Sequence, residues 1–299
     1  MAKILILAPT GFGKSTSILK VPQYGLIGLD PENTYVVSAT SKPLPGAGTG
    51  KLYPVMPNFS LKSTGPDVMN YRRIVLQGGP VGNPGLLAHA INILAQSKKI
   101  VNIVSDDLNY IMQDYYMNKA MAQGWDAPKK IGFDMGKIFE AIETVGENKN
   151  FIALAHFEEY SKADGRIGMR MKTTGKMVQE YITPEGKFDI VLFGHSYYDE
   201  VNRVPRKVFV TNDDGLYSSA KSPIGMFGNL YINNDLGYVT KRVTEYYEEG
   251  IVEEAQVSTY SSISVDDAPV AKIVVPSGDE NLTDDEEQQE TPPANGEEY

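Results

Sequence analysis

The sequence has 299 residues, 41% of them hydrophobic, and it has no cysteine, which excludes disulfide-bonded proteins and thiolate metal sites. Its formal net charge of −10 is uneven, because residues 251–299 hold 13 of the 38 acidic residues and one of the 28 basic residues. No apolar run approaches the ~18 residues of a membrane span, so we expect a soluble cytoplasmic protein without a membrane partner.

The first predicted element is a strand that leads into a glycine-rich loop. Lys3–Leu7 is a short apolar run typical of a buried strand, and residues 8–16 are Ala-Pro-Thr-Gly-Phe-Gly-Lys-Ser-Thr. Glycines allow such a loop to direct its N–H groups at phosphate oxygens, and a helix predicted from 15 to 19 adds partial positive charge. This order of elements predicts a phosphate-binding P-loop.

Roles follow for the residues of the loop. Lys14 is expected to reach the β- and γ-phosphates as a catalytic residue, and the Ser15 hydroxyl is expected to bind Mg²⁺. Ala8 replaces the usual first glycine, and we expect the loop to tolerate this small residue. The residues expected to bind ATP are Thr10, Gly11, Phe12, Gly13, Lys14, Ser15 and Thr16.

Two candidate strands follow, and they compete for the position beside the first strand. If Leu26–Asp30 is the strand next to the first strand, Glu32 lies near the nucleotide and competes with Asp107 as general base. If 34–40 is that strand, which we favour, Glu32 lies in the wrong turn. The elements predicted after these strands are a long surface loop at 41–66, a strand at 71–76 and a helix at 84–96.

The next buried strand, 100–104, ends at two adjacent acidic residues, Asp106 and Asp107. A carboxylate at the tip of a buried strand beside a P-loop binds Mg²⁺ directly or through water, so Asp106 is the predicted metal ligand. Asp107 either activates the attacking water or caps the following helix. Helices are predicted around 108–115 and 135–142, joined by a connection at 118–133.

A third buried strand, 151–155, ends at His156, which either senses the γ-phosphate or is structural. Residues 160–187 are predicted to form a loop that contains a helix at 175–181. Its cations could bind nucleic acid, with Tyr160 and Tyr181 stacking on bases, or the loop could be an ordinary solvated surface. The six cations are Lys162, Arg166, Arg170, Lys172, Lys176 and Lys187. Later strands are predicted at 188–193 and 207–210.

Strands that alternate with helices, and that are mostly apolar throughout, predict an α/β fold with a mostly parallel sheet and helices on both faces. We assign this domain to residues 1–250. Residues 251–299 are predicted to be an acidic, largely disordered tail, because its sequence is too polar to bury a core. This tail either competes with nucleic acid for the cations of the domain or serves solubility.

Over roughly residues 1–250 the chain resembles the phage-encoded RecA-like P-loop (AAA-type) ATPases of DNA recombination and single-strand annealing. The resemblance implies a RecA-like core that hydrolyses ATP with Mg²⁺ and acts on single-stranded DNA in recombination or replication. By the resemblance, Thr10–Thr16 bind phosphates, Ser15 and Asp106 hold Mg²⁺, and the basic loop contacts DNA. It rests on Gly11–Ser15, Ser41-Lys-Pro-Leu-Pro45, Ile103–Asp107, Tyr110–Met112, Ala155-His156, Met171–Lys176 and Ala220–Phe227.

The resemblance also implies a homo-oligomeric ring or filament, in which a neighbouring subunit supplies a cation to the γ-phosphate; Lys221 is our candidate for that cation. A single-strand DNA-binding protein or a recombinase would be a further partner. Two other classes stay open: a small-molecule P-loop kinase with the basic loop as its lid, and a nucleotide-switched DNA-binding or assembly protein. A GTPase is disfavoured, since residues 148–151, Asn-Lys-Asn-Phe, lack the aspartate of Asn-Lys-x-Asp.

Overall fold

The structure, a computed structural model, describes residues 1–76, 84–120, 127–162, 165–174, 178 and 182–253, without the side chains of 119–120 and 127–131. The acidic tail predicted at 251–299 therefore lies outside the described residues, apart from its first three. None of the described helices is long and apolar enough to cross a lipid bilayer.

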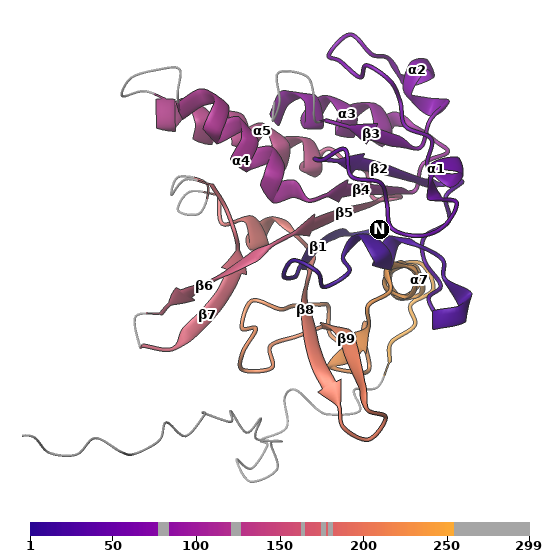
Figure 1. Ribbon diagram of the computed structural model, residues 1–299, viewed down its shortest axis with the longest axis vertical. Helices are drawn as coiled ribbons and strands as arrows, with labels where there is room; N and C mark the ends of the chain where they lie inside the picture. Colours follow the sequence, from indigo (N-terminus) through magenta and orange to yellow (C-terminus); the bar gives the residue numbers. More distant parts are fainter. Residues whose placement is uncertain (77–83, 121–126, 163–164, 175–177, 179–181, 254–299) are drawn as a thin grey trace, which may run out of the picture. The chain divides into compact units, whose positions relative to one another are not determined.

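An eight-stranded sheet forms the centre of the described part, with the order β10-β9-β8-β1-β5-β4-β2-β3 (Figure 1). The strands from β8 to β3 in this order pair in parallel, and β9 and β10 are antiparallel additions at one edge. One strand, β5, separates β1 from β4. The bounds are β1 (Lys3–Leu7), β2 (Thr34–Ser38), β3 (Arg73–Val75), β4 (Asn102–Asp106), β5 (Asn150–Ala155), β8 (Ile190–Asp199), β9 (Val204–Val210) and β10 (Tyr231–Asn233).

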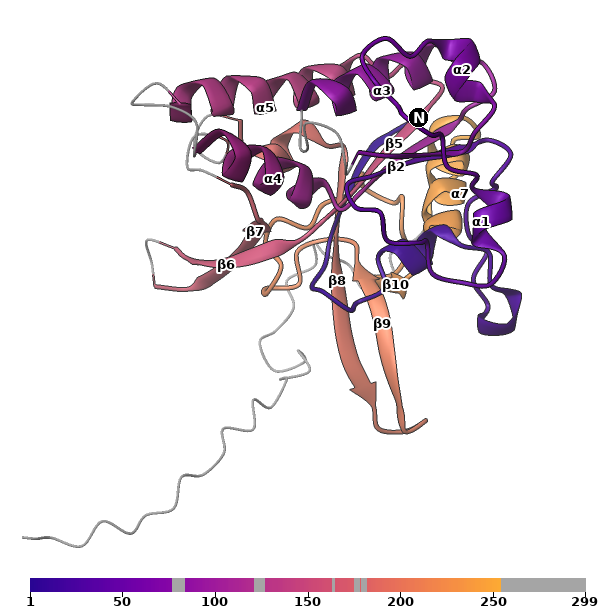
Figure 2. The same ribbon diagram turned by 45° about the horizontal axis from the view of Figure 1, so that its top comes forward.

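Helices cover both faces of the sheet (Figure 2). On one face, α3 (Pro84–Gln96), α4 (Leu108–Ala120) and α5 (Ala127–Glu143) share a core with Leu5 and Leu7. On the other face, α7 (Leu236–Tyr247) packs with Ile4 and Ile6. Alternate residues of a strand face opposite sides, and here both sides are buried, which explains why β1 is apolar throughout. The predicted α/β fold with a mostly parallel sheet is confirmed.

The segment after the P-loop differs from the prediction. The expected helix is a single 3₁₀ turn, η1 (Ser15–Ile18), and a second turn, η2 (Pro22–Tyr24), follows. The strand predicted at 24–30 is wrong, because the N–H groups of Ile27 and Gly28 donate to the carboxylate of Asp235 instead of to a neighbouring strand. Gly28 (φ +64°) also packs closely against another backbone segment, since a Cβ on it would lie 2.2 Å from the Lys20 nitrogen.

The predicted loop at 160–187 is also corrected. β6 (Phe157–Ser161) and β7 (Ile167–Met171) form an antiparallel two-stranded ribbon separate from the main sheet, and η3 (Pro184–Lys187) follows. Most of the helix predicted at 175–181, with Lys176 and Tyr181, lies outside the described residues.

Two connections are more structured than predicted. The long loop at 41–66 contains α1 (Thr49–Leu52) and the start of α2 (Gly65–Met69). The connection predicted at 118–133 is shorter on both sides, because α4 extends to Ala120 and α5 begins at Ala127.

Candidate nucleotide-binding site

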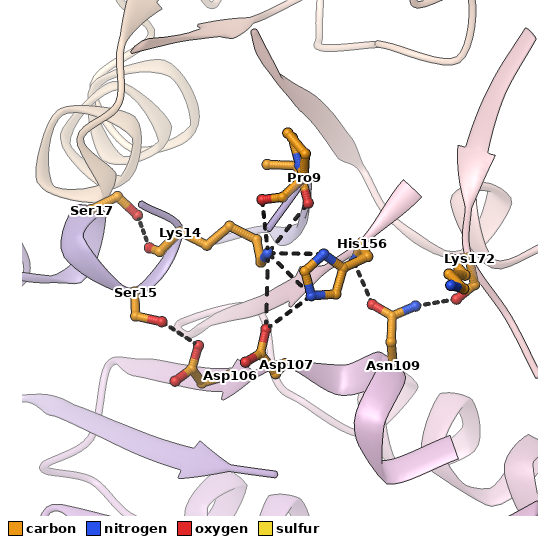
Figure 3. A network of polar contacts seen from close by, with 10 residues as sticks. Pro9, Lys14, Ser15, Ser17, Asp106, Asp107, Asn109, His156 and Lys172 are labelled. Carbon is orange, nitrogen blue, oxygen red and sulfur yellow. Dashed lines mark hydrogen bonds and ion pairs between the residues drawn. The ribbon is translucent and has the colours of Figure 1, made fainter. Parts of the chain in front are cut away.

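The parallel strands β1, β4 and β5 end close together, and the predicted site residues lie at their carboxyl-terminal ends (Figure 3). Leu7 of β1 pairs with Ala155 of β5, and Ser105 of β4 pairs with Ala153 of β5. The P-loop, the Asp106-Asp107 pair and His156 follow directly on these strand ends. In open α/β sheets, ligands bind at the carboxyl-terminal ends of the strands.

The backbone of the P-loop has the expected curled form. Gly11 (φ +78°) and Gly13 (φ +101°) lie in the left-handed region that favours glycine. Phe12 between them is buried, and its ring packs against that of Phe209 at a centroid distance of 5.9 Å. Only the main chain of Phe12 can therefore face a phosphate. Because η1 is one turn long, its dipole is weaker than a long helix would give, which leaves the loop N–H groups and Lys14 as the main source of positive potential.

Two side chains from the C-terminal third of the domain hold carbonyl groups of this loop. Lys207 of β9 donates from Nζ to the Gly11 oxygen at 2.7 Å, and Asn234 donates from Nδ2 to the Gly13 oxygen at 3.3 Å. These hydrogen bonds fix the orientation of two peptide groups of the loop and so help to hold its curled form. The sequence analysis assigned a role to neither residue, since both lie outside every recognised motif.

Lys14 is buried, with 6% of its surface exposed, and its amine lies among polar groups of the site. Nζ donates to the Ala8 oxygen at 3.3 Å, lies 3.2 Å from His156 Nδ1 and lies 3.9 Å from Asp107 Oδ1. Burial lowers the pKa of Lys14, and the two neighbouring aspartates partly oppose that effect. An ammonium group with so little water around it gains strongly from a bound phosphate.

The two predicted metal ligands contact each other. Ser15 Oγ donates to Asp106 Oδ1 at 2.9 Å. Burial, and then the charge of Asp107, raises the pKa of the Asp106 carboxyl to about 6. A hydroxyl and a carboxylate are the hard oxygen ligands that Mg²⁺ prefers when phosphates and water complete its shell, so these residues fit the ion.

Asp107 immediately precedes α4 and has a left-handed conformation, φ +62°, which is rare for a residue other than glycine. Its Oδ1 lies 3.6 Å from His156 Nε2 as well as near Lys14, so the carboxylate faces the P-loop (Figure 3). Burial lowers the pKa of His156, and the charge of Lys14 lowers it further. The site thus places a carboxylate beside an imidazole whose pKa is held below its ordinary value.

Asn109, which the sequence analysis missed, fixes the main chain of His156. Its Oδ1 accepts the His156 N–H, and its Nδ2 donates to the Lys172 oxygen, immediately after β7. The Lys172 N–H in turn donates to the His156 oxygen at 2.8 Å. Asn109 is buried, so one amide joins α4, the end of β5 and the base of the β6–β7 ribbon.

Two predicted candidates lie elsewhere. Glu32 precedes β2 and therefore lies at the amino-terminal ends of the parallel strands, opposite the site. It is exposed, and its Oε2 lies 3.3 Å from Lys99 Nζ and 3.8 Å from Arg72 Nη2. Residues 34–38 do form a strand of the sheet, β2, but the position predicted for it beside the first strand is wrong, because β5 and β8 flank β1 while β2 lies between β4 and β3. Lys221 is exposed, and its backbone pairs with Val191 of β8.

A cavity of about 460 Å³ opens beside Thr16, the last residue of the P-loop. Apolar and aromatic side chains supply much of its wall, and Tyr24 at its margin is largely exposed. Its wall includes Leu19, Val21, Tyr24, Pro31, Pro45, Ala47, Leu52 and Tyr53.

No protein-family model and no curated protein matches this chain. Among solved structures, it is similar to a KaiC-like protein from the hyperthermophilic archaeon Pyrococcus horikoshii OT3, with 11% identity over 70% of this chain and 77% of that chain and a TM-score of 0.31. The structure itself shows an α/β fold with a mostly parallel sheet and the P-loop sequence between β1 and η1.

Proposed function

We propose that the protein binds ATP with Mg²⁺ and hydrolyses it. The observation that carries the proposal is the 2.9 Å hydrogen bond between Ser15 and Asp106, beside the buried Lys14. It brings the hydroxyl of the P-loop and the carboxylate at the end of β4 to one point, where a cation can be held against phosphates.

The side chains around this point have complementary roles in the proposed reaction. Lys14 binds the β- and γ-phosphate oxygens, and Ser15 and Asp106 hold Mg²⁺, which when bound neutralises phosphate charge. Asp107 orients a water and takes its proton while the water oxygen bonds to the γ-phosphorus. The bond from that phosphorus to the bridging oxygen breaks, and its electron pair leaves with ADP. His156 donates a hydrogen bond to the γ-phosphate.

The cavity beside Thr16 is suited to the rest of the nucleotide. Thr16 follows the residues proposed to hold the phosphates, so a nucleotide bound there extends its ribose and base toward the cavity. Aromatic and aliphatic walls favour a flat base over a charged group.

We further propose that the protein acts on single-stranded DNA, as a phage recombination or replication factor in a homo-oligomeric ring or filament. The β6–β7 ribbon supports this role, since Arg170 lies 4.9 Å from the centre of the Tyr160 ring and Arg166 is exposed. Arginine and tyrosine side by side suit stacking on bases and contact with phosphates. A single-strand DNA-binding protein or a recombinase is the proposed further partner.

The test is the rate of ATP hydrolysis with Mg²⁺, with and without single-stranded DNA, with Lys14→Ala as the background control. The expected result is Mg²⁺-dependent hydrolysis that DNA accelerates. DNA binding without significant hydrolysis would instead identify a nucleotide-switched binding protein. Transfer of phosphate to a small acceptor would identify a kinase and overturn the DNA role.

A further inference from the structure

Lys207 projects from β9 onto the face of the β8–β9 pair that packs against the P-loop. Paired residues of antiparallel strands share a face, and Lys207 pairs with Ser196 while Phe209 pairs with Gly194. Phe209 packs against Phe12 of the loop, so the residue two positions earlier, Lys207, extends along the same side. Its Nζ reaches the Gly11 oxygen at 2.7 Å.

The charge of Lys207 is not neutralised within the described part of the chain, where no carboxylate oxygen lies within 4.0 Å of its amine. The neighbouring Arg206 differs, since its Nε donates to Asp199 at 3.2 Å and its side chain faces the opposite side of the hairpin. The ammonium of Lys207 carries three N–H groups, and the Gly11 oxygen accepts one of them. The side chain of Lys207 is exposed to solvent.

We propose that Lys207 is a catalytic residue that contacts the γ-phosphate of ATP bound in the same chain. The proposal rests on the proposed ATP hydrolysis and adds to it a second cation at the loop. Gly11 lies at the tip of the loop, which in a P-loop wraps the β- and γ-phosphates. Lys14 approaches the phosphates from the buried side, and Lys207 approaches from the exposed side. Charge that develops on the phosphate oxygens as the bond to ADP breaks is stabilised by both cations.

This assignment differs from a cation supplied by a neighbouring subunit. Lys207 already bonds to the P-loop of its own chain, whereas Lys221 has its backbone paired with β8 at Val191. A lysine that acts in its own chain requires no oligomer for catalysis. The oligomer, if formed, then serves DNA binding or regulation.

The first experiment separates charge from the hydrogen bond to Gly11. Lys207→Gln keeps an N–H donor but removes the charge, Lys207→Arg keeps the charge, and Arg206→Gln is the matched control one residue away. We expect Lys207→Gln to lower kcat by about 10²–10³-fold, Lys207→Arg to retain more of it, and Arg206→Gln to match the wild type.

A binding measurement that does not depend on turnover accompanies this experiment. Affinities for ADP and for adenylyl imidodiphosphate, a non-hydrolysable ATP analogue, are measured by calorimetry with Mg²⁺. We expect Lys207→Gln to weaken analogue binding by about tenfold and to leave ADP binding within about threefold. Equal losses for both ligands would overturn the proposal and make Lys207 a clamp of the loop. A wild-type protein that binds the analogue without hydrolysing ATP would overturn the proposed hydrolysis, while the comparison of the two ligands would still test Lys207.

The second experiment tests whether Lys207 acts in its own chain. Lys207→Gln protein is mixed with Lys14→Ala protein, which has an intact Lys207 but an inactive P-loop. If Lys207 acts within its chain, the mixture shows only the activity of Lys207→Gln. Recovery of hydrolysis in the mixture would show that Lys207 of one subunit serves the site of another and would overturn the assignment.

Discussion

Gly194 of β8 lies directly beneath Phe12, so that a Cβ on Gly194 would lie 2.8 Å from two ring atoms of Phe12 and 2.5 Å from the Cβ of Ala8. The strand and the P-loop are thus in contact with no space for a methyl group. This contact also gives a reason for alanine at position 8, since a larger side chain there would meet the same strand.

Gly194→Ala should therefore push the P-loop away from β8. We expect the free energy of unfolding to fall by about 1–3 kcal/mol and the affinity for Mg²⁺-nucleotide to fall by about tenfold or more. Denaturant unfolding and calorimetry would measure both. The control is Gly136→Ala in α5, where a Cβ meets nothing within 4 Å and should stabilise the helix by about 0.5–1 kcal/mol. Normal nucleotide affinity in Gly194→Ala would contradict a tight contact.

Lys14→Ala should abolish ATP hydrolysis and weaken triphosphate binding. The amine of Lys14 is the buried cation of the site, and the transition state adds negative charge next to it. Lys14→Met provides a second variant that keeps the buried volume, so its thermal unfolding shows whether the fold is intact. Undiminished hydrolysis by both variants would disprove the assignment of the P-loop.

Asp107→Asn should bind ATP normally and hydrolyse it about 10²-fold more slowly or worse, if the carboxylate takes the proton of water. Asparagine tolerates the left-handed backbone at this position, whereas alanine would add strain there. Single-turnover kinetics would separate binding from chemistry. Glu32→Gln is the control, because Glu32 lies at the amino-terminal ends of the parallel strands, opposite the site. A wild-type rate for Asp107→Asn would leave Asp107 with only a structural role as the residue that precedes α4.

Asp106→Asn should stabilise the metal-free protein at neutral pH. The pKa of Asp106 is raised from 3.8 to about 6, so the folded state binds the proton more tightly than the unfolded state. Stability contributed by this group is therefore lost as pH rises from about 4 to 6. We expect a gain of roughly 1–3 kcal/mol at pH 7.5 and a smaller gain at pH 5. Denaturant unfolding at both pH values would measure it, and a pH-independent difference would show that the buried charge of Asp106 is not the cause.

Asn109→Ala should loosen the contact between His156 and the β6–β7 ribbon. We expect a loss of about 1–3 kcal/mol in stability and faster amide hydrogen exchange in 157–171. Asn109→Asp keeps the acceptor for the His156 N–H but sets a buried carboxylate oxygen against the Lys172 oxygen, so it should show the exchange effect with at least as large a loss of stability. Unchanged exchange in both variants would mean that Asn109 does not hold the ribbon.

Much of the core was predictable because its signals are local. The strand Lys3–Leu7 and the helix Pro84–Gln96 have the predicted bounds, since an apolar run and an N-terminal proline each specify their own element. The apolar run at 24–30 led to a wrong prediction because only its local pattern was considered. Its residues are apolar enough for a strand, but their N–H groups bond to Asp235, which is more than 200 residues distant in sequence.

The β6–β7 ribbon and the C-terminal elements could not be predicted from the pattern of neighbouring residues. Residues 157–161 include two glutamates, and their strand is stable because it pairs with 167–171 and is anchored at His156. The sequence analysis assigned no element between 216 and 250, where β10 and α7 complete the sheet and its second layer.

The sequence by itself determined the chemistry available to the protein: a loop of glycines with Lys14 and Ser15, an aspartate pair at the end of an apolar strand, and an α/β fold. These features depend on residue type and on spacing along the chain. Only the tertiary structure decided which side chains from distant segments meet that loop. Lys207, Asn234 and Asn109 reach their partners because hydrogen bonding between strands and packing against both faces of the sheet fix their positions. Such contacts follow from the path of the whole chain, and no pattern of neighbouring residues specifies them.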